Sequence, residues 1–314
     1  MCVQDDDNSP MRPELHGVAP LSHLGVIRVQ GEEAAKFLHG QLTQDFSLLG
    51  LGEARLAAFC SAKGRMLASF IGFKRTPDDI VLVCQRDLLA ATLKRLTMFV
   101  MRAKVSLKDD SEAWSLWGLA GNAMDNLGIT PSEPWKKWDL GESHVIGLYP
   151  ADGLPRALWM APTSAPKPDG TTLSNALWQW TDVRCGVTLI SQAVSDAFVP
   201  QMLNYESVGG VNFKKGCYPG QEVVARSQFR GTLKRRGYLV HTASPVKAGD
   251  ELFDASDLSQ PCGLVALAAT TPDGGYDAWV SLQVSAAESG HLQVGPNGSP
   301  VTVLPLPYPL LEDI

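Results

Sequence analysis

Apolar and polar positions in the first third of the chain follow two different periods. Runs rich in β-branched and other apolar residues predict strands at 24–29, 66–73, 80–84 and 104–107. Apolar residues at helical spacing predict helices over 32–42 and 87–100. Strands that alternate with helices in this way indicate an α/β or α+β layer, with the helices on one face of a sheet.

The middle of the chain has a different pattern. Residues 111–170 hold five tryptophans and many prolines, and the strands they suggest are short. We interpret this segment as a second subdomain of similar α+β type. From 173 to 185 the pattern is helical again, and Gly186 is expected to end that helix.

The last part of the chain changes to short strands without helices. We expect these strands at 237–241, 263–269, 276–284 and 301–304. Asp273-Gly274-Gly275 is typical of a hairpin turn between the middle two. A small β-barrel or sandwich is the natural closure for such a series of strands.

These patterns divide the 314 residues into a tail and two larger regions. We expect a disordered tail at 1–15, a main region at 16–228 and a C-terminal β-barrel at 229–314. Within the main region, subdomain one takes 16–110 and 171–228, and subdomain two takes about 111–170.

Composition excludes several classes of protein. A hydrophobic content of 45% and a charged content of 19% are those of an ordinary soluble globular protein. No apolar run approaches the roughly 18 residues of a membrane span, and residues 1–13 lack the basic start and apolar stretch of a secretory signal. We therefore expect a cytoplasmic protein. The six cysteines contain no C-x-x-C pair and the six histidines have no metal-ligand spacing, so no metal site is predicted.

Charge is distributed unevenly along the chain. The window 212–240 holds seven bases and one acid, whereas the whole chain has a net charge of −6. A basic patch on an acidic body suits an anionic small ligand or a local contact with RNA. A solvated basic face is the alternative interpretation.

One short passage carries candidate chemistry. Cys217 stands between a glycine and a tyrosine, with Lys214 and Lys215 just before it and a Pro219-Gly220 turn pair just after it. Nearby cations favour a thiolate, which is the reactive form of cysteine. These residues alone also fit a buried structural cysteine beside an ordinary turn.

The run KGCYPGQE, from Lys215 to Glu222, resembles the signature of the YgfZ family of folate-binding proteins, in which K-G-C-Y-x-G-Q-E is the defining stretch. Other landmarks of that family are also matched. They are Gly31, Phe37, Gly40-Gln41, Thr43 and Asp45, then Lys63-Gly64-Arg65, and later Ala225-Arg226 and Arg230-Gly231. The resemblance covers roughly Leu21 to the end and is thin between 111 and 170.

This resemblance implies a fold similar to that of the glycine cleavage T-protein. That fold has two ferredoxin-like α+β units and a C-terminal β-barrel around a central channel that takes folate, so region 16–228 would be the folate-binding region. The implied cofactor is tetrahydrofolate. The implied partners are iron–sulfur enzymes, notably the enzyme that thiomethylates tRNA.

The resemblance also implies roles for single residues. Cys217 would be the functional thiol, and its matching neighbours are Lys215, Tyr218, Gln221 and Arg226. Trp178 lies where family members can offer a tryptophan to folate, and a second aromatic contact would fall at Leu24, which is not aromatic. By charge, Lys214 and Arg230 suit the glutamate tail of folate, and Arg184, at the position of a pterin contact in T-proteins, is also counted among the implied folate-site residues.

Two other functions stay open. One is a folate-dependent aminomethyl or one-carbon transferase like the T-protein. Against it, Arg184 stands where T-proteins place a glutamate that holds the pterin, and an arginine cannot accept the N–H donors of that ring. We can name no general acid or base, so the leading interpretation is a non-enzymatic accessory factor. The other function is direct RNA binding through the basic window 212–240.

Overall fold

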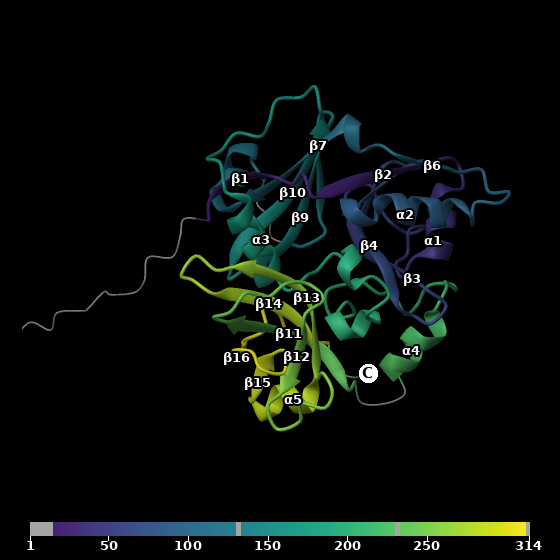
Figure 1. The fold of residues 1–314 in the computed structure, drawn as a ribbon. Coiled ribbons are helices and arrows are strands. Elements are labelled where there is room, and N and C mark those ends of the chain that lie inside the picture. The colour runs from purple at the N-terminus through teal and green to yellow at the C-terminus, as the bar shows by residue number, and fades with distance from the viewer. Residues whose placement is uncertain (1–14, 130–132, 230–232, 312–314) are drawn as a thin grey trace, which may run out of the picture.

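The protein is built from two antiparallel sheets and a closed barrel (Figure 1). Its computed structural model describes residues 15–129, 133–229 and 233–311. The predicted tail at 1–15 lies almost wholly outside the described residues. Mixed helices and sheets followed by a barrel confirm the predicted α+β class.

The first sheet has the strand order β3-β4-β5-β2-β6. Its strands are β2 (Leu24–Gln30), β3 (Ala54–Cys60), β4 (Met66–Thr76), β5 (Asp79–Gln85) and β6 (Ser106–Asp109), and its helices are α1 (Ala34–Gln41) and α2 (Arg86–Thr97). Side chains alternate across the sheet because successive residues of a strand point to opposite faces. Ile27 and Val29 pack with the helices, whereas Val26 belongs to the cluster that faces the second sheet.

The second sheet has the order β1-β7-β10-β9-β8. Its strands are β1 (Gly17–Pro20), β7 (Trp114–Ala120), β8 (Lys137–Leu140), β9 (Ser143–Ala151) and β10 (Leu154–Pro162), with η1 (Ser111–Ala113) and η2 (Gly121–Leu127) beside β7. Strand β1 pairs with β7, so the first strand of the chain lies in the second sheet. The domain boundaries given above stay a prediction.

The barrel closes in the order β11-β14-β13-β12-β15-β16. Its strands are β11 (Arg235–Thr242), β12 (Glu251–Asp254), β13 (Gly263–Thr270), β14 (Tyr276–Gln283), β15 (Leu292–Val294) and β16 (Pro300–Leu304). Thr270 pairs with Tyr276, which confirms the predicted hairpin turn. The expectation of strands without helices was wrong, because α5 (Val284–Ser289) directly follows β14 and buries Ala286 against the barrel interior.

Helix α3 (Asn175–Arg184) lies between the second sheet and the barrel (Figure 1). The Ser174 hydroxyl caps it by accepting a hydrogen bond from the Leu177 N–H at 3.2 Å. Gly186, with φ +69°, follows its end as predicted. The chain then runs through η3 (Gln192–Val194) and η4 (Pro200–Leu203) to α4 (Gln221–Phe229), and no helix among the described residues is long and apolar enough to cross a membrane.

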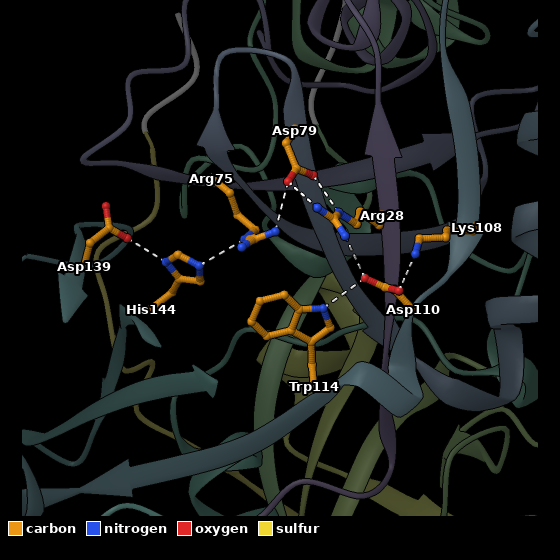
Figure 2. A network of polar contacts seen from close by, with 8 residues as sticks. All are labelled: Arg28, Arg75, Asp79, Lys108, Asp110, Trp114, Asp139 and His144. Carbon is orange, nitrogen blue, oxygen red and sulfur yellow. Dashed lines mark hydrogen bonds and ion pairs between the residues drawn. The ribbon is translucent and has the colours of Figure 1, made fainter. Parts of the chain in front are cut away.

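A polar network joins the two sheets (Figure 2). Arg28 and Arg75 both donate to Asp79, Arg75 at 2.9 Å, and Arg75 also donates to His144 Nε2 of the second sheet at 3.3 Å. His144 Nδ1 lies 2.6 Å from an Asp139 oxygen. Because the guanidinium can only donate, Nε2 must accept, and the proton of the neutral imidazole lies on Nδ1.

Candidate functional site

Cys217 lies on a loop between η4 and α4, and its side chain is exposed. The other described cysteines, Cys60, Cys84, Cys185 and Cys262, are buried. Burial raises the pKa of the Cys60 and Cys84 thiols to about 12, so both stay protonated at neutral pH. Among the described thiols, therefore, only Cys217 is open to a partner.

Lys215 is buried beside this exposed thiol. Its ammonium lies 4.5 Å from the centroid of the Tyr218 ring, which is also buried, and donates to the Gly216 carbonyl at 3.0 Å. Desolvation lowers the pKa of Lys215 to about 8, and the charges of Asp45 and Cys217 oppose that shift. Burial likewise raises the pKa of Tyr218. The motif thus places a buried amine, whose pKa is lowered to about 8, behind the cysteine.

The segment before the cysteine is bound to the start of the chain. The Thr43 hydroxyl donates to the Gly210 carbonyl at 2.6 Å, and the Asn212 N–H donates to the Thr43 carbonyl at 2.9 Å. The Gln44 amide donates to the Gly209 carbonyl at 2.6 Å. Thr43 and the glycine-rich run, which are far apart in sequence, therefore form one unit.

The turn after the cysteine is bound in a similar way. Gly220 has φ +81°, as the predicted type II turn requires at its third residue, and a Cβ there would lie 2.4 Å from the Ser61 carbonyl oxygen. At Gly64, which has φ +71°, a Cβ would lie 2.8 Å from Val223 of α4. The Lys63-Gly64-Arg65 landmark thus supports the turn that follows Cys217, and both turns need glycine.

His39 and Asp45 also belong to this site. His39 Nδ1 lies 3.0 Å from Asp45 Oδ1, and a Cβ built on Gly216 would lie 3.1 Å from His39 Nε2. From the sequence, Asp45 was predicted only as a family landmark and His39 was not predicted at all. Their contact with the loop depends on tertiary packing, which the spacing of His39 and Asp45 in the sequence does not show.

The remaining predicted neighbours lie around the loop. Gln221 opens α4, and Arg226 pairs with Glu222 one turn earlier on the same helix. Lys214 is exposed on the loop itself. Arg230 lies outside the described residues. No three His, Cys, Asp or Glu side chains gather as a possible metal site within the part of the chain that is described.

A separate cavity lies where the two sheets, α3 and the barrel meet. It has a volume of about 250 Å³. Leu24 lines it from β2 of the first sheet, and Leu267 lines it from the barrel. Tyr149 of β9 in the second sheet and Trp135, in the segment just before β8, also line it. Trp178 of α3 completes its aromatic wall. The predicted Trp178 and Leu24 are therefore together in one cavity, whereas no residue of the cysteine loop lines it.

Polar groups converge on this apolar cavity. Arg156, which is 1% exposed, stacks its guanidinium 4.4 Å from the centroid of the Trp178 ring and pairs with Asp182. Arg156 Nε and the Ser191 hydroxyl are buried and have no hydrogen-bond partner among the described residues. A few convergent polar groups in a mostly apolar pocket are typical of small-molecule sites.

The two faces of α3 explain which of its residues reach the cavity. Trp178 and Asp182 are four residues apart and share one face. Arg184 is on another face, where it donates to Asp152 at 2.7 Å and to Asp277 at 3.3 Å. Arg184 therefore lies away from the cavity. Asp182 was missed by the sequence analysis, although helical spacing from Trp178 would have found it.

Comparison with known proteins gives the class. Residues 13–127 match the family model described as the GCVT N-terminal domain. The solved structure of glycine cleavage system aminomethyltransferase T from Bartonella henselae superposes with a TM-score of 0.70, covering 95% of this chain and 87% of that chain at 16% identity. The protein therefore has the fold of the T-protein, as the resemblance implied.

The family follows from closer relatives. The chain is 30% identical over 302 residues to the tRNA-modifying protein YgfZ of Edwardsiella ictaluri, across 90% of this chain and 89% of the relative. It is also 30% identical over 309 residues to the protein of the same name from Photorhabdus laumondii, across 93% of this chain and 92% of the relative. The chain belongs to the YgfZ family.

Proposed function

We propose that this protein is a cytoplasmic, tetrahydrofolate-binding accessory factor for iron–sulfur enzymes, that it supports thiomethylation of tRNA, and that Cys217 is its functional thiol. The observation that carries the proposal is the exposure of Cys217, on a loop that two distant sequence landmarks hold in place. The name of these relatives, tRNA-modifying protein YgfZ, supports the link to tRNA.

The central cavity fits the ring system of a folate. Trp178 lines the cavity beside Arg156, and an aromatic contact between its ring and a bound flat ring would contribute about 1 kcal/mol. Asp182 can accept the N–H donors of a pterin. Arg156 Nε and the Ser191 hydroxyl, which have no partner among the described residues, can pair with its remaining polar atoms. Bound tetrahydrofolate would supply a carrier for a one-carbon unit.

The volume of the cavity limits what it holds. At about 250 Å³ it lies just below the common range of roughly 300–1,000 Å³ for small-ligand pockets, so it suits the ring head of folate and leaves the glutamate tail outside. Lys214 and Arg230 stay predicted partners of that tail. Arg184, held by Asp152 and Asp277, takes no part in this proposal.

Aminomethyl transfer is not proposed. The likeness to the aminomethyltransferase is at 16% identity and shows the fold, and function depends on the site rather than on the fold. The structure brings Asp182 into the cavity, but the cysteine loop contributes nothing to its wall. A thiol that faces solvent suits a partner protein or its cluster better than a reaction inside the cavity.

Filling the cavity tests where folate binds. Ala268 lines the cavity from β13, and Ala268→Trp should abolish the tetrahydrofolate binding that isothermal titration detects with wild type. The matched control is Thr270→Trp, which adds the same side chain at the exposed end of that strand and should bind as wild type does. Equal binding by both variants would place folate elsewhere, and a wild type that binds no tetrahydrofolate would remove the cofactor from the proposal.

A further inference from the structure

A second, larger pocket lies between η4, α4 and the barrel. Its volume is about 780 Å³. Three cations line it: Arg226 of α4, Lys234 just before β11, and Arg235 at the start of β11. None of the described lining residues is acidic. The thiol loop and the central cavity do not contribute to this pocket, so it is a separate feature.

Arg235 is a partly buried cation with no counterion among the described residues. Its guanidinium donates to the backbone carbonyls of Cys262 at 2.9 Å and Pro261 at 3.4 Å, and it has no carboxylate partner in the described parts of the chain. A charge removed from water without an opposite charge is costly, and an anion in the pocket would offset that cost. The exposed Lys234 also has no ion pair among the described residues.

Gln201 adds an independent polar group. Its side chain is fully buried on the wall of the pocket. Its amide nitrogen donates to the Val224 carbonyl at 2.8 Å, which fixes the direction of the amide and leaves Oε1 without a partner among the described residues. The occupant should therefore carry a hydrogen-bond donor as well as negative charge.

Apolar side chains complete the pocket. Val199, Met202, Leu233 and Val284 line it beside the cations. We propose that this pocket binds a ribonucleotide unit, with its phosphate on Lys234 and Arg235, its base or sugar on the apolar wall, and a donor group on Gln201. That unit is either a free nucleotide or part of an RNA chain, and the proposal goes beyond the thiol and folate sites.

Binding of a labelled tRNA transcript to the full chain tests this proposal by fluorescence anisotropy. Lys234→Glu should weaken binding about tenfold or more, because it replaces a phosphate contact with a like charge. It should also reduce the slope of log affinity against log salt by about 1. The control is Lys247→Glu, which makes the same charge change at an exposed lysine elsewhere on the barrel and should change affinity less than about twofold.

Competition distinguishes the two sources of the ligand. If AMP displaces the tRNA, the pocket takes a single nucleotide, and if only unlabelled tRNA does, it takes a segment of RNA. The proposal is overturned if neither tRNA nor AMP binds the wild type, if the two lysine variants lose affinity equally, or if a poly-glutamate peptide competes as well as RNA. Because binding is read with purified protein, a failure here leaves the role of Cys217 in cells to its own test.

Discussion

Single residues of the cysteine loop have titration behaviour that can be measured. Lys215 has a pKa lowered by burial from its ordinary 10.5 to about 8. The unfolded chain therefore binds more protons than the folded protein between pH 8 and 10.5, and the free energy of unfolding should rise with pH across that window. Lys215→Met should remove this rise and stabilise the protein below pH 8.

Denaturant unfolding at several pH values measures the rise, and an NMR titration of ¹³C-methylated lysines measures the pKa directly. Lys214→Met is the matched control, because its side chain is the exposed neighbour on the same loop and its loss should leave the rise in place. A midpoint above pH 10 for Lys215 would contradict the account of a buried amine behind Cys217.

At this scale the sequence predicted the thiol but only part of its surroundings. Lys215, Cys217 and Tyr218 lie within four consecutive residues, so a short sequence motif can identify them. His39 and Asp182 reach their sites through tertiary packing and through the choice of one face of α3, which single-residue signals do not show. Arg184 looked like a folate contact by position, but its partners are Asp152 and Asp277.

At the scale of elements, the network of Figure 2 joins the two sheets through His144. Burial lowers the pKa of His144 from its ordinary 6.5, and Asp139 opposes that shift. Below pH 6.5 the unfolded chain takes up a proton that the folded protein resists, so stability should be lost as pH falls from 6.5 through the folded pKa.

Replacing His144 by glutamine tests this link between the sheets. Glutamine is neutral at every pH in this range and keeps both an acceptor for Arg75 and a donor for Asp139. The unfolding free energy of wild type should therefore fall more steeply between pH 7 and pH 5 than that of His144→Gln, measured by urea denaturation. Parallel curves would show that the pKa of His144 is the same in the folded and unfolded states.

Most elements of the first sheet and the barrel follow from sequence periodicity. Strand β3 (ARLAAFC) was not predicted because three of its six buried positions hold alanine and none holds a β-branched residue. Helix α5 was not predicted because its six residues are too few to show a helical period. Between 111 and 170, four strands form a regular sheet with β1, but their alternating pattern was not recognised because prolines and tryptophans are frequent there.

At the scale of the whole molecule, three units meet around one cavity while the thiol lies apart from it. No pattern within a single element could show that arrangement, because the cavity takes its wall from both sheets, α3 and the barrel. The fold and the family were nevertheless accessible from sequence, because the cysteine motif is specific. Under the proposed function, folate and the partner of Cys217 would therefore bind at different places on the molecule.

The central claim is that Cys217 acts as a thiol in cells, and its most direct test is complementation of a strain that lacks its own YgfZ protein. Wild type, Cys217→Ser and Cys262→Ser would be expressed at equal soluble levels, and thiomethylated tRNA would be quantified by mass spectrometry. Cys262 is buried in the barrel, so its replacement controls for the loss of a thiol in general. We predict that wild type and Cys262→Ser restore the modification and that Cys217→Ser, folded to the same thermal midpoint, does not. Equal restoration by all three proteins would contradict the functional role of Cys217.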